Sequence, residues 1–438
     1  MTPNIHIPLS NLALDEFHDS RIRCAILGCG MMGQEHVSYI MGYSSKIQIN
    51  YLCDPFEPSL EKARKIMTEC RSSEDPLVVG NPLNSQPCLL MDEEDLLRHV
   101  DDIDLLVIAS PNYLHTPSLL KWGRHDITIL VEKPVAVSRQ QHDELRSVST
   151  SSDWQARVWV AMEYRYIPAI AKLVSLLPET IGELKMITIR ENRYPFLHKI
   201  GDWNRDRYKT GDTLVEKCCH FFDLFRFITG QEAILSKMKT LAQRGVNYQE
   251  EDDQPTVPII DSAYVTMPFS SNSTDTTVTT TNTSREVGNK WSNAIGCLEL
   301  CMFSEGSRHQ EEIIVTGTKG RLEAYLPENK VYQFCRPNHD LWSDRSIPPP
   351  SNSIHHQVYD CSNVREIHSI ESEIPKHQGY HYSSTAIEWY HLLKEVQRYK
   401  HTGEFVPHVS IDDGLRAVEM GIEATAKLAN DLDDGEKY

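Results

Sequence analysis

The sequence predicts an α/β protein with two domains: an N-terminal doubly wound parallel sheet, and a C-terminal α+β domain with a large, mostly antiparallel sheet. Residues 21–150 alternate short apolar runs with segments of helical period, the pattern of parallel strands joined by crossover helices. Strand-like runs follow one another in residues 151–438, which favours antiparallel pairing. The length of 438 residues suits two or three domains. Residues 1–20 are expected to form an N-terminal tail.

The first domain is expected to alternate strands and helices. The expected strands are 23–27, 47–53, 104–109 and 128–131. The expected helices are 32–41, 58–68, 92–99, 117–124 and 139–148. In the second of these helices, Leu60, Ala63 and Met67 recur at helical spacing. Residues 71–87 contain three prolines and are expected to form a loop. This order of elements is typical of nucleotide-binding domains.

The second domain is expected to contain one sheet with helices on one side. The expected strands are 158–164, 184–191, 234–242, 262–269 and 296–303, followed by a hairpin over 312–325. The helices expected to cover this sheet are 213–228, 383–399 and 411–432. Three polar segments are expected to be surface insertions, at 249–258, 270–289 and 337–353.

Charge and composition exclude several classes of partner. There are 44 Lys and Arg against 62 Asp and Glu, a net charge of −18, which disfavours binding to nucleic acid or anionic lipid. We expect no membrane helix, because no run of about 18 apolar residues occurs, and no secretory signal. The eleven cysteines lack a regular framework, so we expect reduced thiols, a cytoplasmic protein and no metal site.

A glycine-rich segment follows the first expected strand and opens the first expected helix. Residues 28–33 read Gly-Cys-Gly-Met-Met-Gly, a G-x-G-x-x-G pattern. Glycines let the backbone approach a pyrophosphate, and the free N–H groups at the start of a helix stabilise its charge. The residues predicted to contact a dinucleotide here are Gly28, Gly30, Met31, Met32 and Gly33. A glycine turn without a ligand would give the same pattern.

An acidic residue ends the second expected strand. Asp54 lies 21 residues beyond Gly33, where a carboxylate accepts hydrogen bonds from the ribose hydroxyls of NAD. The same charge repels the 2′-phosphate of NADP, and the next residues, Pro55 and Phe56, offer no arginine to offset that repulsion. The sequence therefore favours NAD, with NADP as the alternative.

Polar residues also follow two later strands of the first domain. One group is Ser110, Asn112 and His115, and the other is Glu132 and Lys133, which precede a proline. Open α/β sheets bind ligands at the carboxyl ends of their strands. We therefore expect both groups to line the dinucleotide site, although a salt-bridged turn would explain Glu132 and Lys133 equally well.

Taken in order, these motifs resemble the glucose-fructose oxidoreductase/inositol dehydrogenase/MocA (Gfo/Idh/MocA) family of NAD(P)-dependent oxidoreductases. The resemblance covers residues 21–429. Its carriers are the segment 28–33 with His36, then Asp54, Ser110-Pro111-Asn112 with His115, Glu132-Lys133-Pro134, and the segment 211–220 with Asp223. The resemblance implies a Rossmann domain followed by an α+β domain with a large open sheet. It also implies that Arg165 can reach the cofactor or substrate.

In the family, the lysine of Glu-Lys-Pro and an Asp-x-x-x-His pair form the catalytic set. By motif, these positions are Lys133, Glu216 and His220, with glutamate in place of aspartate. Residues four apart on one helix share a face, so Glu216 is expected to hold the His220 ring and stabilise its protonated form. His220 would take the proton of a substrate hydroxyl, and Lys133 would stabilise the developing charge on that oxygen.

Tyr194, Trp203 and Asn204 are expected to line the substrate pocket, and His377 is a weaker candidate because nothing pairs it with the catalytic set. Two further residues depart from the family pattern. Lys217 stands beside Glu216 and could compete for its carboxylate, and Asp212 replaces a glycine.

The leading functional hypothesis is an NAD(P)-dependent dehydrogenase that oxidises a secondary hydroxyl of a sugar, inositol or related polyol. Two alternatives stay open. One is a non-catalytic dinucleotide-binding regulator, which the departures from the family pattern motivate. The other is a redox-assisted glycosidase that recycles its NAD. Because an open sheet face commonly pairs with another subunit, we also expect a homodimer or homotetramer.

Overall fold

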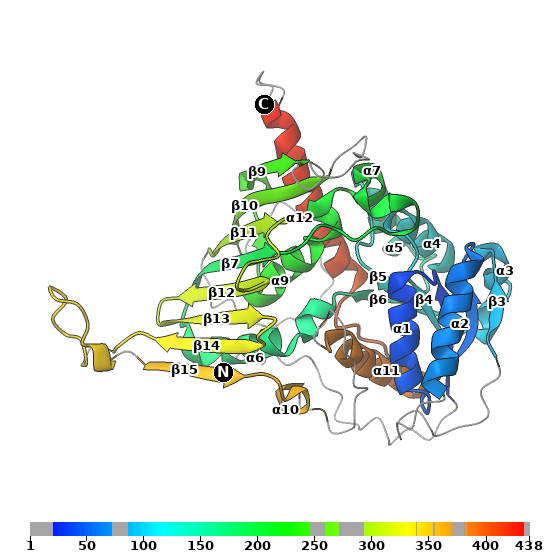
Figure 1. The fold of residues 1–438 in the computed structure, drawn as a ribbon, viewed down its shortest axis with the longest axis horizontal. Coiled ribbons are helices and arrows are strands. Elements are labelled where there is room, and N and C mark those ends of the chain that lie inside the picture. Colours follow the sequence, from blue (N-terminus) through cyan, green and yellow to red (C-terminus); the bar gives the residue numbers. More distant parts are fainter. Residues whose placement is uncertain are drawn as a thin grey trace.

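Two sheets organise the chain, a parallel sheet of six strands and a mostly antiparallel sheet of nine (Figure 1). The computed structural model describes residues 21–71, 86–245, 259–270, 293–338, 340–353, 355–368, 370, 381 and 383–432. The predicted fold class is confirmed: a doubly wound α/β domain precedes a domain built on a large sheet with one parallel pair, β7 with β11. The expected tail over 1–20 lies outside the described residues.

The parallel sheet has the strand order β3-β2-β1-β4-β5-β6. Its strands are β1 (Ile22–Leu27), β2 (Ile47–Cys53), β3 (Cys88–Leu90), β4 (Leu105–Ile108), β5 (Thr128–Glu132) and β6 (Arg157–Ala161). Leu105 and Val107 of β4 belong to one hydrophobic core, whereas Leu106 and Ile108 belong to the other. Both faces of this sheet are therefore covered, which explains the continuous apolar run in the sequence. Each such buried side chain contributes about 1.5–3 kcal/mol.

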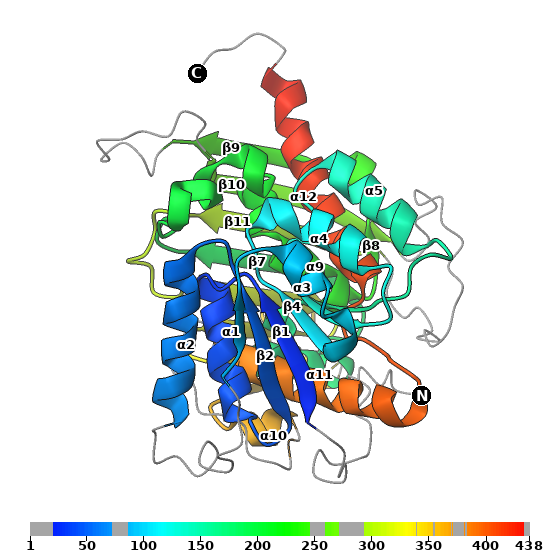
Figure 2. The same ribbon diagram turned by 90° about the vertical axis from the view of Figure 1, so that its right-hand side faces the viewer.

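Helices pack on both faces of the parallel sheet. They are α1 (Met31–Gly42), α2 (Glu57–Arg71), α3 (Glu93–Leu97), α4 (His115–Trp122) and α5 (Arg139–Ser149). Side chains on two of them are buried beside β1, Val37 from α1 and Leu60 from α2, and Figure 2 shows both helices next to β1 and β2. The start of α4 precedes the predicted one by two residues, because Pro117 fits within the first turn, where no backbone donor is needed.

Two elements that the sequence assigned to the second domain pack with the parallel sheet of the first domain. The segment expected to open the antiparallel sheet forms β6, which pairs in parallel with β5, and residues Glu163–Tyr166 form a short 3-10 helix, η4, after it. Helix α11 (Ser384–Thr402) packs against β1 through side chains such as Trp389 and Leu393, which share a core with Ile26. An apolar pattern shows that an element has a buried face, but it does not specify which sheet covers that face.

The second sheet has the order β15-β14-β13-β12-β7-β11-β10-β8, and β9 also pairs with β10. Its strands are β7 (Leu184–Asn192), β8 (Glu232–Ala233), β9 (Lys239–Arg244), β10 (Ile260–Ser270), β11 (Ile295–Cys301), β12 (Glu311–Gly317), β13 (Gly320–Leu326), β14 (Lys330–Cys335) and β15 (His355–Asp360). The predicted hairpin is confirmed as β12 and β13. Strands β14 and β15 were missed, because β15 is the edge strand, β14 is next to it, and both bury few residues, so their sequences lack apolar alternation.

Helices α6 (Pro168–Thr180), α9 (Cys219–Thr229) and α12 (Ile411–Leu432) lie between the two sheets (Figure 1). Helix α6 was not predicted, and the short α10 (Val364–His368) was also missed. The expected insertions at 249–258 and 270–289 lie, apart from Ser270, outside the described residues. The third contains a short helix, Ser351–Ser353, and projects from the sheet between β14 and β15 in Figure 1.

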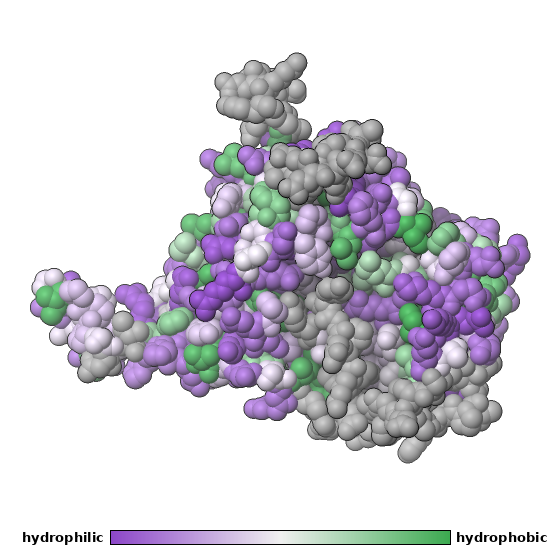
Figure 3. All heavy atoms as spheres, in the orientation of Figure 1, coloured by the Kyte–Doolittle hydropathy of each residue, from purple (hydrophilic) through white to green (hydrophobic). Residues whose placement is uncertain are grey.

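The surface agrees with the acidic, polar composition. Hydrophilic residues predominate on the described surface in the view of Figure 3, with hydrophobic residues scattered among them. None of the helices in the described part of the chain is long and apolar enough to cross a membrane.

Candidate functional site

The glycine-rich segment lies between β1 and α1, and its three glycines have different roles. Gly28 has φ +95°, and a Cβ there would lie 2.5 Å from the backbone of Ala109 and Ser110. A Cβ at Gly33 would lie 2.0 Å from the Gly28 carbonyl oxygen. At Gly30 a Cβ would meet no described atom within 4 Å. The outer glycines thus permit close packing, and the middle one leaves the backbone open to a ligand.

Asp54 follows β2 and faces the glycine-rich segment. Its two carboxylate oxygens accept hydrogen bonds from the backbone N–H groups of Cys29, at 2.7 Å, and Phe56, at 2.8 Å. A carboxylate has about four acceptor positions, so these bonds orient Asp54 and leave it able to accept from two hydroxyls. The position agrees with the predicted ribose contact.

The end of β4 presents two polar atoms without partners. The Ser110 hydroxyl oxygen and the Asn112 side-chain nitrogen are buried and have no hydrogen-bond partner among the described residues. Buried polar atoms normally form hydrogen bonds, so these two atoms indicate a ligand at the carboxyl end of β4. His115 differs from the prediction, because its ring nitrogens both lie 2.8 Å from carbonyl oxygens, those of Ser110 and Pro134. It joins the ends of β4 and β5 instead of facing a ligand.

Glu132 also has an internal partner. The His36 Nε2 atom lies 2.9 Å from a Glu132 carboxylate oxygen. The Trp389 indole N–H donates to His36 Nδ1 at 3.1 Å, so the proton of a neutral His36 lies on Nε2 and is donated to Glu132. Burial alone would raise the pKa of Glu132, but this hydrogen bond and the charge of Lys133 lower it. Glu132 therefore joins β5 to α1 and α11.

Lys133 forms an ion pair with Glu216. Its Nζ atom lies 3.1 Å from the Glu216 carbonyl oxygen and 3.6 Å from the carboxylate. Burial opposes both charges, yet the mutual attraction raises the pKa of Lys133 and lowers the pKa of Glu216. The lysine is thus a charged donor, fixed at the carboxyl end of β5, where a cis peptide bond joins it to Pro134.

The expected pairing of Glu216 with His220 is wrong. The predicted helix over 213–228 is divided into α8 (Thr213–Glu216) and α9, which begins at Cys219. The break changes the relation between the two side chains, and Lys133 occupies the Glu216 carboxylate. His220 instead places Nε2 at 3.4 Å from Glu163.

The environment of His220 also differs from the expectation of a stabilised imidazolium. Burial, followed by the charges of Lys133 and Lys217, lowers the pKa of His220 well below its usual value. A lowered pKa means that the ring is neutral near pH 7 and can accept a proton. Its Nδ1 atom is buried and has no hydrogen-bond partner among the described residues.

Lys217 and Asp212 have structural partners. Lys217 points away from Glu216, since its Nζ atom donates to the Tyr164 hydroxyl at 2.6 Å. Asp212 has φ 73°, and its carboxylate accepts from the backbone N–H of Thr213 at 2.8 Å. It also forms an ion pair with Arg244. Lys217 therefore does not compete for Glu216, and Asp212 caps α8 in a conformation that glycine usually adopts.

Arg165 is engaged within the protein. Its guanidinium donates two hydrogen bonds to Asp223, at 2.6 and 2.5 Å, and one to the His408 carbonyl at 2.9 Å. This pair is buried in the second domain, so Arg165 contributes to packing and orientation, and the expected contact with cofactor or substrate has no support in this geometry.

The loop before α8 contains the predicted substrate residues. Asn204 is buried and donates to the Leu197 carbonyl at 2.8 Å, while its side-chain oxygen has no partner among the described residues. Trp203 and Tyr194 are half-buried. The Lys199 ammonium lies 4.6 Å from the centre of the Trp203 ring.

Lys199 was not predicted. Burial lowers its pKa, and the charges that act on it include those of Glu216 and Lys133, so it lies near the ion pair. A single lysine in a loop has no sequence pattern that marks it. His377 lies outside the described residues.

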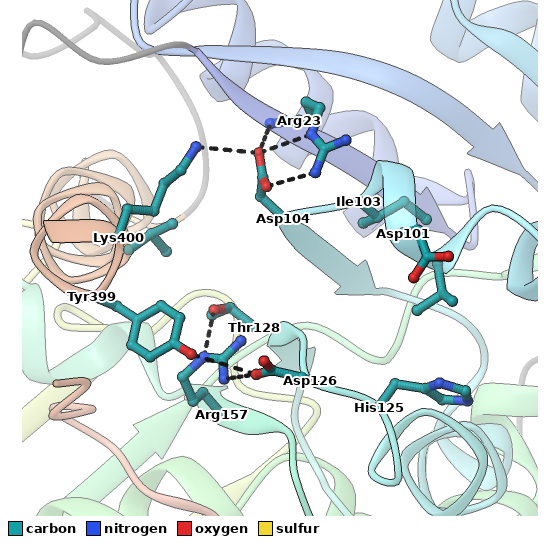
Figure 4. Close-up of a pocket in the computed structure, with 12 residues that line it drawn as sticks. Arg23, Asp101, Ile103, Asp104, His125, Asp126, Thr128, Arg157, Tyr399 and Lys400 are labelled. Carbon is teal, nitrogen blue, oxygen red and sulfur yellow. Dashed lines mark hydrogen bonds and ion pairs between the residues drawn. The ribbon is translucent and has the colours of Figure 1, made fainter. Parts of the chain in front are cut away.

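A separate pocket of about 340 Å³ lies at the opposite end of the parallel strands (Figure 4). Arg23 is paired there with Asp104 at 3.0 Å, and Arg157 is paired with Asp126. Lys400 also contacts Asp104. These charges neutralise one another, and the pocket lies at the amino ends of the strands, where such sheets do not bind ligands. In the described part of the chain, no group of three or more potential ligands could hold a metal ion.

Comparison with known proteins identifies both domains. Residues 22–160 match the family described as oxidoreductase family, NAD-binding Rossmann fold, and residues 175–431 match its C-terminal alpha/beta domain. An inositol 2-dehydrogenase of Pseudarthrobacter chlorophenolicus is 25% identical over 213 residues, 48% of this chain and 55% of that protein. A 2,7-anhydro-N-acetylneuraminate hydratase of Mediterraneibacter gnavus is 24% identical over 188 residues, 42% and 47% of the two chains. The chain spans about half the length of these curated relatives.

Solved structures share the fold. A levoglucosan dehydrogenase in complex with NADH has a TM-score of 0.66 at 16% identity, with 94% of this chain and 98% of that chain covered. An NAD-binding oxidoreductase of Klebsiella pneumoniae has a TM-score of 0.68 at 16% identity, with the same coverage of 94% and 98%. Both parts of the chain match one family over most of its length, so the protein belongs to the Gfo/Idh/MocA oxidoreductases and carries their NAD-binding Rossmann domain.

Proposed function

We propose that the protein is an NAD-dependent dehydrogenase that oxidises a secondary hydroxyl of a sugar, inositol or related polyol. The observation that carries this proposal is the arrangement after β5 and in α9: Lys133 is a charged donor held by Glu216, and His220 is a neutral ring whose Nδ1 atom has no partner among the described residues. The substrate class is supported by relatives named inositol 2-dehydrogenase and levoglucosan dehydrogenase.

The residues at the carboxyl ends of the parallel strands fit a dinucleotide. The unpartnered atoms of Ser110 and Asn112 offer hydrogen bonds, and the open space at Gly30 lets a pyrophosphate approach the backbone. Asp54 suits the two ribose hydroxyls of NAD and would repel a 2′-phosphate. NADP is therefore the less favoured alternative.

The chain supplies the proton chemistry of the reaction. NAD, when bound, accepts the hydride from the substrate carbon. Lys133 donates a hydrogen bond to the substrate oxygen and stabilises its developing negative charge. His220 Nδ1, which has no protein partner among the described residues, accepts the hydroxyl proton. Glu216 keeps the Lys133 ammonium charged and in place.

The proposal is tested with purified protein, NAD and a panel of polyols and sugars, by following the absorbance of reduced cofactor. We expect His220→Ala and Lys133→Ala to lower kcat by roughly 100- to 10,000-fold, and His125→Ala, in the pocket at the opposite end of the parallel strands, to leave it unchanged. Wild-type rates in the first two variants would contradict the assigned roles. Sugar release without net NADH would favour the glycosidase alternative.

The regulator alternative stays open. Asp212 and Lys217, two of the features that favoured it, have partners that account for them, while the three insertions also favoured it. NAD binding without turnover on the whole panel would support it.

We further propose that the chain forms a dimer or tetramer through the open face of the second sheet. Met186 and Ile295 lie opposite each other on β7 and β11 and are more than half exposed, at 54% and 56%. Exposed apolar pairs of this kind commonly mark an interface. The second domain, residues 151–438, would then carry both substrate and subunit contacts. We also propose a cytoplasmic location, supported by the absence of a disulfide among the eleven cysteines, all of which are described.

A further inference from the structure

A row of titratable side chains leads from His220, the proposed base, to residues that the proposed function does not use. Its next member is Glu163 of η4, whose carboxylate lies 3.4 Å from His220 Nε2. The same Glu163 oxygen lies 3.8 Å from Nε2 of His381. The other ring nitrogen of His381 lies 2.9 Å from Glu35 of α1. Four groups from different parts of the sequence are thus brought into contact.

The contact with Glu163 fixes the tautomer of His220. Above its pKa of about 7, Glu163 is ionised and can only accept a hydrogen bond, so the proton of a neutral His220 then lies on Nε2, toward Glu163. Nδ1 then carries the lone pair, and Nδ1 is the ring atom that is buried without a partner among the described residues. Glu163 therefore leaves the basic nitrogen facing a position that no described residue fills with a hydrogen-bond partner.

Solvent exposure is higher in the outer half of the row than in the inner half. The side chains of His220 and Glu163 are 3% and 6% exposed, whereas those of His381 and Glu35 are 22% and 14% exposed. The row thus runs from a buried base to the surface. The distances of 3.4 and 3.8 Å are slightly longer than hydrogen bonds, and such contacts commonly shorten when a substrate binds.

We propose that Glu163 is the positioning residue of His220 and receives its proton, and that His381 and Glu35 pass this proton to solvent. The inference rests on the proposed dehydrogenase function. In the family pattern, the carboxylate four residues before the histidine has this role. In this chain that carboxylate belongs to Glu216 and is paired with Lys133, so the proposal assigns the role to Glu163.

The proton is accounted for at each step. The substrate O–H bond breaks and Nδ1 of His220 gains the proton, while the substrate carbon loses a hydride, with its two electrons, to the cofactor. The proton on Nε2 then moves to the Glu163 carboxylate and next to His381, and it leaves to water beside Glu35. His220 is then neutral but carries its proton on Nδ1, and after product release it loses that proton to water and regains one on Nε2, which restores the starting tautomer.

Proton acceptance by Glu163 agrees with its surroundings. Burial raises its pKa to about 7, with His381 acting in the opposite direction, and a proton carrier works best when its pKa lies near the working pH. The other charged groups that act on Glu163 are Glu132 and Lys133. Those that act on His220 besides His381 are Lys133, Lys217 and Arg193.

Neighbouring weak acids do not compete with Glu163 for the proton near pH 7. Burial raises the pKa of Tyr39, Tyr164 and Cys219, each of which is also influenced by the Glu163 charge. Glu388, a buried glutamate of α11, has a raised pKa as well and accepts a hydrogen bond from Trp159 at 3.0 Å. It offers a matched control because it is equally buried and bonds to a different partner.

The kinetic test compares Glu163→Gln with Glu388→Gln in the full-length protein, using the panel substrate that is oxidised fastest. We expect Glu163→Gln to lower kcat by about 100-fold or more, to remove the loss of rate below pH 7, and to leave NADH affinity within about twofold. Glu163→Asp should recover part of the rate, and Glu388→Gln should retain kcat. An unchanged kcat and pH profile in Glu163→Gln, or equal losses in the two glutamine variants, would overturn the proposal.

A second measurement does not depend on turnover. Nitrogen-15 NMR of histidine-labelled protein, with and without NAD, reports which ring nitrogen of His220 carries the proton, the signal being assigned by its loss in His220→Gln. We expect a neutral ring protonated at Nε2, and a proton on Nδ1 would overturn the pairing with Glu163. If no panel substrate is oxidised, the dehydrogenase function fails together with the proton route, while the NMR result still decides the pairing.

Discussion

The ring of Tyr164 stacks on the ring of His220, with centroids 4.4 Å apart and planes 10° from parallel. The Tyr164 hydroxyl donates to Glu311 at 2.6 Å and accepts from Lys217. Tyr164 therefore packs against His220, the proposed base, and also forms hydrogen bonds within a buried cluster that contains Glu311 and Lys217.

These two roles can be separated by substitution. Tyr164→Phe keeps the stack but removes the hydroxyl, so we expect a loss of about 1–3 kcal/mol in unfolding free energy with most of kcat retained. Tyr164→Leu also removes the stack, and kcat should fall further than in Tyr164→Phe. Urea unfolding and steady-state rates measure the two effects. A Tyr164→Phe variant with wild-type stability would show that the hydroxyl does not stabilise the cluster.

The Lys133–Glu216 pair predicts a shift at alkaline pH. Glu216 raises the pKa of Lys133, so the lysine stays charged throughout the working range. Glu216→Gln removes that charge, and we expect the pKa of Lys133 to fall and activity to be lost at a lower alkaline pH than in the wild type. The pH dependence of kcat measures the shift. Glu419→Gln, in a surface pair with Arg146, is the control and should leave the alkaline limb unmoved.

Asp54 predicts cofactor preference. Asp54→Ser should weaken NAD binding by roughly 10- to 100-fold, because bonds to a charged group contribute about 1.5–3 kcal/mol, and should weaken NADP binding less. The ratio of the two dissociation constants, from fluorescence titration of the reduced cofactors, is the measurement. Part of the loss has a local cause, since Asp54 also holds the Cys29 N–H. An unchanged ratio would remove Asp54 from the ribose site.

A buried group of histidines predicts acid sensitivity. Burial lowers the pKa of His408 to about 3 and of His368 to about 4, and lowers that of His391 well below its usual value. Unfolded histidines titrate near about 6.5, so below that pH the unfolded state binds more protons than the folded state. Stability is therefore full above about pH 6.5 and falls toward pH 4, by about 1.4 kcal/mol per pH unit for each proton.

Urea unfolding at pH 7 and pH 5 tests this sign. We expect His408→Gln to reduce the pH dependence, and His355→Gln, on the exposed edge strand β15, to leave it unchanged. The same slope in His408→Gln and wild type would exclude His408 as a source of the acid sensitivity.

The open face of the second sheet predicts assembly. Ile295→Arg places a charge in the exposed apolar pair with Met186, and we expect it to shift the proposed dimer or tetramer toward monomer in sedimentation experiments. Leu341→Arg, an exposed residue of the projecting segment 337–353, should not. A monomeric wild type at micromolar concentration would refute the proposed assembly.

Local features of the sequence predicted more of this site than long-range ones did. The glycine-rich segment and Asp54 were predicted together because their chemistry depends on short spacing and on the end of a strand, and the structure places Asp54 against the Cys29 N–H. The partner of His220 was missed because Glu163 lies far away in sequence and the helix breaks at Lys217. Arg165 was assigned to the ligand by the resemblance to the family, and its partner Asp223 could not be paired with it from sequence alone. Spacing along the chain does not reveal contacts made by folding.

The bond from Trp389 to His36 links the first helix of the chain to α11, which ends at Thr402. Because α11 shares a core with β1, the nucleotide domain keeps part of its apolar surface uncovered until the ribosome has made α11. A fragment that stops after β6 would lack this cover. The first domain therefore precedes the second in the sequence, but its core is complete only when α11, which follows the second sheet, is present.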